Sequence, residues 1–200
     1  GVLTGVGAAL NTADIRDGDS VAVIGAGGVG LNVIQGAKIA GASKIIAIDM
    51  FESKLKMAEQ FGATDLVKAD DGDPVAAVMG LTEGRGADVA FEVIGLKPTI
   101  EQAINMTRNG GEAVLVGVPR MDVMLELNAA FTFLYLAKTV KGCWYGSSNV
   151  RTDVPKLIGL YKDGKLKLDE MITTEYTLDE INQGYQDMRD GKNFRGLIKY

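Results

Sequence analysis

The chain has 200 residues, of which 46% are hydrophobic and 24% are charged, and its formal net charge at pH 7 is −5. This composition is typical of one globular domain, or one domain plus an appendage, and the acidic balance disfavours a nucleic-acid partner. Because histidine is absent, a His general base and a His-containing metal site are excluded within the chain. The single cysteine excludes a disulfide framework and favours a reducing, cytoplasmic location. No apolar run reaches the ~20 residues of a membrane span, and no signal-peptide pattern is present, so we expect no membrane partner.

Short aliphatic runs alternate with helical patterns through the first part of the chain. The runs expected to form strands are Val21–Ile24, Lys44–Ile48, Leu66–Val67, Asp88–Val93 and Gly111–Val116. Apolar residues at helical spacing follow the first four runs, over about 29–40, 51–58, 74–79 and 98–104. Gly62 is expected to cap the second helix, and Asp73 with Pro74 is expected to begin the third. The alternation predicts an α/β fold, a doubly wound parallel sheet of Rossmann type.

The end of the chain departs from this alternation. The apolar segment Leu134–Trp144 is expected to be a helix that turns into a strand. Helix patterns follow over Asp153–Tyr161 and Thr177–Met188, the second with a capping box of Thr177 and Glu180, and Gly196–Tyr200 is a possible last strand. We therefore assign the tail to a different structural unit.

A glycine-rich turn follows the first expected strand and begins a helix. It reads Gly25-Ala26-Gly27-Gly28-Val29-Gly30 and matches the dinucleotide-binding fingerprint in its required context. Gly25 permits a tight turn, Gly27 lets a pyrophosphate approach the backbone, and Gly30 allows the helix to pack closely. The free N–H groups at the helix start would face the phosphates. The alternative is a glycine-rich turn without a ligand.

An acidic residue stands at the end of the second expected strand. Asp49 lies 19 residues after Gly30, close to the ~20 of the fingerprint. Its carboxylate could accept hydrogen bonds from the adenosine ribose and would repel a 2′-phosphate, and neither Met50 nor Phe51 supplies an arginine for that phosphate. The pattern therefore favours NAD over NADP, unless Asp49 is only a turn residue.

The whole chain also resembles a known family. The opening run GVLTGVGAALNTADIRDGDSVAVIGAGGVGLNVIQGAKIAGASKIIAIDM, the stretches FEVIG (91–95) and LVGVP (115–119), and the ending FRGLIKY (194–200) resemble the coenzyme domain of zinc-dependent medium-chain alcohol dehydrogenases. The resemblance is closest to the branch with glutathione-dependent formaldehyde dehydrogenases and aryl- or alkyl-alcohol enzymes. It implies an NAD-dependent enzyme that takes a hydride from a primary alcohol or a hydroxymethyl-thiol adduct.

The resemblance implies roles for individual residues. The implied cofactor-binding residues are Thr4, Val116 and Val118 near the nicotinamide, Gly25, Gly27, Gly28, Val29, Gly30 and Arg195 at the pyrophosphate, Asp49 and Lys54 at the adenosine ribose, and Ile94 beside the adenine. The aliphatic members could instead be ordinary core residues. Lys54 could be a solvated helix residue, and Arg195 could be a surface charge.

The chain lacks the residues that zinc chemistry needs. A catalytic zinc takes three protein ligands and acts as a Lewis acid on the alcohol oxygen, whereas this chain has no histidine and one cysteine, Cys143. We interpret Cys143 as a small buried hydrophobic residue in mid-strand. The resemblance implies that the zinc ligands lie in a catalytic domain before Gly1, so we expect no catalytic or metal-binding residue here. Residues 1–145 would form the NAD-binding domain, and residues 146–200 would return to the catalytic domain with exposed apolar faces.

Two further expectations concern assembly and the alternatives to this function. The apolar edge Leu134–Tyr145 is expected to pair with a second copy in a homodimer or homotetramer, unless the return segment covers it. The chain could instead be a nucleotide-sensing Rossmann module, or a zinc-free relative of quinone-oxidoreductase type.

Overall fold

A computed structural model describes all residues, 1–200, and divides into two compact units, Gly1–Asp153 and Val154–Tyr200. No helix combines the length and the apolar character that crossing a bilayer requires.

The first unit is built on a six-stranded sheet. Its strands are β1 (Ser20–Ile24), β2 (Lys44–Asp49), β3 (Asp65–Lys68), β4 (Ala87–Glu92), β5 (Thr107–Leu115) and β6 (Thr139–Gly142). All neighbouring strands are parallel, in the order β3-β2-β1-β4-β5-β6. This is the Rossmann order, which reverses between β1 and β4 and opens a crevice at the carboxyl ends of the strands. The predicted fold class is confirmed.

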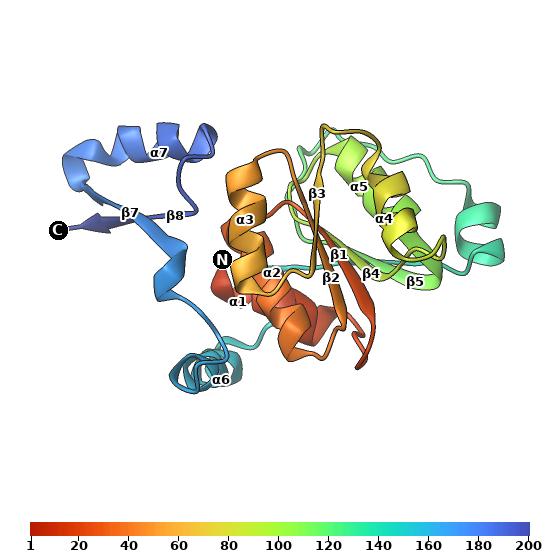
Figure 1. Ribbon diagram of the computed structural model, residues 1–200, viewed down its shortest axis with the longest axis horizontal. Coiled ribbons are helices and arrows are strands. Elements are labelled where there is room, and N and C mark those ends of the chain that lie inside the picture. Colours follow the sequence, from red (N-terminus) through yellow and green to blue (C-terminus); the bar gives the residue numbers. More distant parts are fainter. The chain divides into compact units, whose positions relative to one another are not determined.

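Helices cover both faces of this sheet (Figure 1). They are α1 (Val2–Gly7), which continues as a π-helical turn over Ala8–Thr12, α2 (Gly28–Ile39), α3 (Glu52–Phe61), α4 (Pro74–Leu81) and α5 (Lys97–Met106). The first three helices lie on one side of the strands and α4 and α5 lie on the other. Short helical turns at Ala130–Tyr135 and Tyr145–Ser147 flank β6.

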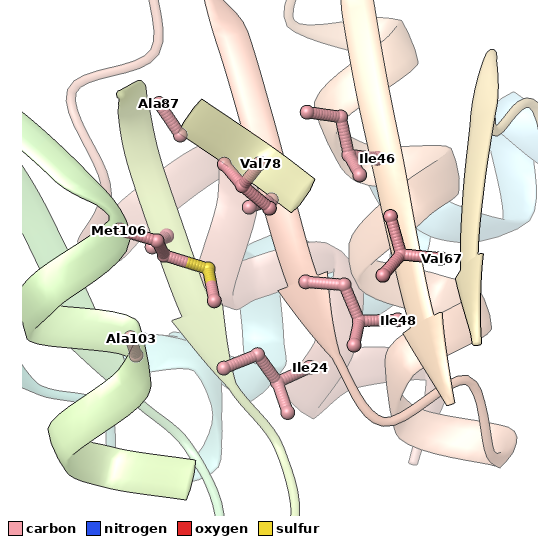
Figure 2. Packing of buried hydrophobic residues seen from close by; sticks show 10 residues of the cluster. Ile24, Ile46, Ile48, Val67, Val78, Ala87, Ala103 and Met106 are labelled. Carbon is pink, nitrogen blue, oxygen red and sulfur yellow. The ribbon is translucent and has the colours of Figure 1, made fainter. Parts of the chain in front are cut away.

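The aliphatic strand runs produce the core because β1 and β4 are buried along their whole length and β2 is buried from Ile45 to Asp49. On the α4 and α5 face, Ile24, Ile46 and Ile48 pack against Val78 and Met106 (Figure 2). Alternate strand residues point to opposite faces, so the intervening residues of β1 and β2 face α2 and α3. This two-sided burial is why these strands are continuously apolar.

The predicted helix boundaries in this unit are confirmed at two points. The Asp73 carboxylate accepts a hydrogen bond from the backbone N–H of Val75 (3.0 Å), with Pro74 in the first turn of α4. Gly62 ends α3 in the left-handed conformation, with φ +119°. A helix at the very start of the chain, α1, was not predicted.

The second unit contains the end of α6 (Val150–Lys162), then β7 (Ile172–Thr177), α7 (Ile181–Arg189) and β8 (Arg195–Lys199). β7 and β8 form a parallel pair, and the predicted capping box of Thr177 and Glu180 is present. The unit exposes several apolar side chains, namely Ile158, Ile172, Leu178, Tyr185, Met188 and Leu197.

The interpretation of Cys143 needs correction. Cys143 follows the end of β6 instead of lying in mid-strand, and it is half-buried. Its sulfur accepts a hydrogen bond from the Thr12 hydroxyl (3.3 Å). After Gly142 the chain turns toward the Tyr145–Ser147 segment. Cys143 therefore lies beside Thr12, at the end of the π-helical turn that follows α1, and outside the core.

Candidate functional site

The turn between β1 and α2 depends on two glycines. Gly25 has φ +99°, a conformation that other residues rarely adopt, and its N–H donates to the Ile48 carbonyl (2.8 Å). A Cβ on Gly30 would overlap the carbonyl oxygen of Gly25. The start of α2 therefore rests directly on the turn, and a side chain at Gly30 would force the two apart.

The start of α2 is open. Gly27 is its N-cap, no side chain caps the helix, and nothing lies within 4 Å of the position a Cβ on Gly27 would occupy. The first N–H groups of an α-helix have no partner within the helix, and they lie at the positive end of its dipole. This arrangement can accept an anion such as a pyrophosphate, with Gly27, Gly28 and Val29 supplying backbone donors.

Asp49 is buried and fixed at the end of β2. Its Oδ2 accepts a hydrogen bond from the Ala26 N–H (2.8 Å), and its Oδ1 accepts one from the Phe51 N–H (3.0 Å). The Lys54 Nζ lies 4.0 Å from Oδ2 and 4.7 Å from the centre of the Phe51 ring. A carboxylate has about four lone-pair positions, so both oxygens of Asp49 keep capacity to accept hydroxyl groups.

A groove of about 510 Å³ joins these features at the carboxyl ends of β1, β2 and β4. Five of the sequence-predicted residues line it: Gly25, Gly27, Asp49, Lys54 and Ile94. Lining residues that the sequence did not single out are Ile24, Ile48, Met50, Phe51, Ala69, Asp70, Pro74, Val93, Leu96, Pro98, Thr99 and Gln102. Phe51 carried a signal, since a large aromatic residue stands two positions after the strand-end acid.

Val116 and Val118 lie outside this groove but next to its wall. Val116 is buried, and its N–H donates to the Glu92 carbonyl (2.8 Å), whereas the Val118 side chain is exposed. A Cβ on Gly95 would lie 2.5 Å from the Val118 carbonyl oxygen. The loop after β4 and the loop after β5 are therefore in backbone contact.

Glu92 holds the loop after β4 and was missed by sequence reasoning. It is fully buried at the end of β4, and its Oε1 accepts hydrogen bonds from the N–H groups of Ile94 (2.9 Å) and Gly95 (2.8 Å) and from the Thr99 hydroxyl (2.7 Å). An acidic residue within the apolar run DVAFEV was the available signal, because a buried carboxylate needs partners.

The remaining predicted residues are more scattered. Thr4 is half-buried on α1, and the neighbouring Gly5 packs so closely on α2 that a Cβ would overlap the Val29 carbonyl oxygen. Arg195 begins β8 in the second unit and is exposed. No group of three or more His, Cys, Asp or Glu side chains could hold a metal ion.

Comparisons with known proteins agree with this geometry. A family model described as zinc-binding dehydrogenase matches residues 28–163. The chain is 43% identical over 206 residues to alcohol dehydrogenase B of Mycobacterium tuberculosis, covering 100% of this chain and 54% of that protein. It is 36% identical over 207 residues to S-(hydroxymethyl)glutathione dehydrogenase of Paracoccus denitrificans, covering 100% and 55%.

A solved structure of benzyl alcohol dehydrogenase from Acinetobacter calcoaceticus matches with a TM-score of 0.94 and 35% identity, over 100% of this chain and 54% of that one. The chain spans about half the length of the curated relatives it matches. Three findings lead to one conclusion: the Rossmann strand order, the glycine turn with its strand-end acid, and the family match over residues 28–163. The chain belongs to the zinc-dependent medium-chain alcohol dehydrogenase family.

Proposed function

We propose that the chain is the coenzyme-binding part of an NAD-dependent, zinc-containing alcohol dehydrogenase. One observation carries the proposal: the Asp49 carboxylate is fixed by two backbone N–H groups beside the open start of α2 at Gly27. A ribose acceptor and a pyrophosphate cradle then adjoin each other, as an adenine dinucleotide requires.

The residues present fit NAD. Asp49 and Lys54 would hold the adenosine ribose, the N–H groups of Gly27, Gly28 and Val29 would hold the pyrophosphate, and Ile94 would flank the adenine. When bound, the nicotinamide of NAD supplies the hydride acceptor. Thr4, Val116 and Val118 would orient that ring.

The groove supports NAD over NADP through its charge. Asp49 would repel a 2′-phosphate, and Lys54 is the only Lys or Arg among the residues that line the groove. Lys54 already lies close to the Asp49 carboxylate and over the Phe51 ring. A 2′-phosphate on the ribose would therefore find only the Lys54 ammonium, which already contacts the Asp49 carboxylate and the Phe51 ring.

The substrate proposal comes from the relatives. Their names include a benzyl alcohol dehydrogenase and an S-(hydroxymethyl)glutathione dehydrogenase, so we propose a primary alcohol or a hydroxymethyl-thiol adduct as the hydride donor. The residues of this chain do not fit a zinc site. The zinc would be held by residues outside the chain.

Purification of the product of the complete coding sequence tests this proposal. We expect bound zinc and NAD reduction with benzyl alcohol or S-hydroxymethylglutathione. A zinc-free protein that reduces quinones would contradict it, and so would a protein that binds nucleotides without turnover.

We also propose a cytoplasmic homodimer or homotetramer assembled through the Leu134–Tyr145 edge. β6 is the last strand of the sheet, and exposed Leu134, Tyr135, Trp144 and Tyr145 flank it. Such an edge can pair with its symmetry mate. A solution mass equal to one chain at high micromolar concentration would contradict this assembly.

A further inference from the structure

A second cavity lies at the opposite end of the sheet from the Asp49 groove. Arg85 precedes β4, Arg108 is the second residue of β5, and Lys138 precedes β6, so all three stand at the amino ends of parallel strands. They line a cavity of about 670 Å³. The Asp49 groove, in contrast, lies at the carboxyl ends. The two sites are therefore separated by the length of the sheet.

The lining of this cavity is cationic, although the chain as a whole is acidic. Arg85, Arg108 and Lys138 line it together with the amides Asn105 and Asn109, and no Asp or Glu does so. The net charge of the whole chain is −5. The positive charge at this cavity is therefore a local feature that runs against the charge of the whole chain, and such a patch attracts anions.

Asp88 explains how the two arginines are oriented. The Asp88 carboxylate accepts hydrogen bonds from Arg85 Nη2 (3.2 Å) and Arg108 Nε (2.5 Å). It also accepts two from Ser20, one from the backbone N–H (2.8 Å) and one from the hydroxyl (2.6 Å). One carboxylate thus holds two guanidinium groups and cancels only one of their charges. Fixing an arginine by one edge leaves its other edge prepared for a second partner.

Several donors at the cavity remain uncommitted. Arg85 bonds only through Nη2, and Arg108 uses Nε and Nη1, the latter donating to the Asn109 carbonyl (2.8 Å). Arg85 therefore keeps Nε and Nη1, and Arg108 keeps Nη2. The side-chain amides of Asn105 and Asn109 make no hydrogen bond within the chain, although both backbone carbonyls accept one.

The carboxyl ends of α4 and α5 reach this end of the sheet and contribute partial negative charge. Lys138 compensates α5, because its Nζ donates to the carbonyls of Ile104 (2.8 Å) and Asn105 (3.3 Å). Helix ends carry about half a charge each, so the two helix ends and Asp88 together neutralise about two positive charges. Arg85, Arg108 and Lys138 carry three, which leaves an excess of about one positive charge at the cavity.

We propose that this cavity binds a phosphate dianion, either free or carried on a small organic body. Arg85 Nε and Nη1, Arg108 Nη2 and the Asn105 and Asn109 amides would donate to its oxygens. Arginine forks match phosphate geometry and form charge-assisted hydrogen bonds. The apolar lining residues Met79, Phe131 and Leu136 offer a wall for an organic group.

The test is a residue-resolved NMR titration of the chain with inorganic phosphate and, separately, phenyl phosphate at low ionic strength. We expect saturable shifts at residues 84–86 and 105–109. Tighter binding of phenyl phosphate would indicate an organic phosphate, and equal binding would indicate free phosphate. Phosphate bound at Gly27 would shift different resonances, so this proposal and that of the coenzyme site fail separately.

Two variants probe the donors. Arg85→Gln removes an exposed guanidinium but leaves Asp88 bonded to Ser20 and Arg108, and it should weaken phosphate binding about tenfold. Asn109→Asp adds a negative charge without touching Asp88 and should weaken binding at least as much. Lys56→Gln is the matched control, because Lys56 is similarly exposed and paired with Glu52, and it should leave the affinity within about twofold. Shifts that grow without saturation, or variants that both bind like the wild type, would overturn the proposal.

Discussion

Asp88 is expected to make the stability of the first unit depend on acidic pH. Burial raises the pKa of Asp88, but hydrogen bonds from Ser20 and Arg108 and the charge of Arg85 lower it by a larger amount. The pKa of Asp88 therefore falls from 3.8 to about 2. A lowered pKa stabilises the fold above the unfolded-state pKa, and this stabilisation is lost as the pH falls toward the folded-state value. The shift corresponds to about 2 kcal/mol at pH 7, of which about half remains at pH 3.

The variant Asp88→Asn isolates this contribution because asparagine does not titrate. It also leaves Arg85 and Arg108 without a counter-charge, so we expect a loss of about 2–4 kcal/mol in the free energy of unfolding at pH 7. The gap between wild type and variant should narrow by about 1 kcal/mol between pH 5 and pH 3.

Urea unfolding followed by circular dichroism measures that gap. Asp70→Asn is the control, because Asp70 is an exposed partner of Lys68, and it should leave stability almost unchanged at both pH values. A gap for Asp88→Asn that is the same at pH 5 and pH 3 would refute the reasoning.

Three further substitutions separate folding from binding. Gly27→Ala should keep the wild-type melting temperature, because its Cβ enters open space, yet weaken NADH binding more than about tenfold by blocking the backbone approach; full binding would count against the cradle. Gly30→Ala should lower the melting temperature by several degrees, because its Cβ overlaps the Gly25 carbonyl oxygen, and an unchanged melt would show that the turn can shift freely. Ile46→Ala should cost about 2–5 kcal/mol in urea unfolding, because Ile46 is fully buried in the core of Figure 2, and a cost below about 1 kcal/mol would mean that the core repacks.

The first unit could be predicted from sequence because its signals are local. Continuous aliphatic runs identify strands that are buried on both faces, and the 3.6-residue spacing between them identifies the helices. The glycine turn and Asp49 are likewise read from spacing along one βαβ segment. Gly25, Gly27 and Asp49 therefore lie together in the groove, as their spacing predicts.

Features that depend on distant contacts were not predicted. β7 reads Ile172-Thr-Thr-Glu-Tyr-Thr177, with polar residues at most positions and only Tyr176 buried, so its pairing with β8 has no apolar run to reveal it. Glu92 depends on the loop after β4 folding back over it. The surroundings of Cys143 depend on Thr12, which is far away in the chain.

The central claim is that this chain binds NAD through Asp49 and the start of α2. Its most direct test is a fluorescence titration of the chain with NADH and with NADPH, repeated on Asp49→Asn. The account predicts saturable binding, NADH tighter than NADPH, and a preference that shrinks in the variant because the repulsive carboxylate is gone. No binding of NADH, or tighter binding of NADPH by the wild type, would contradict it.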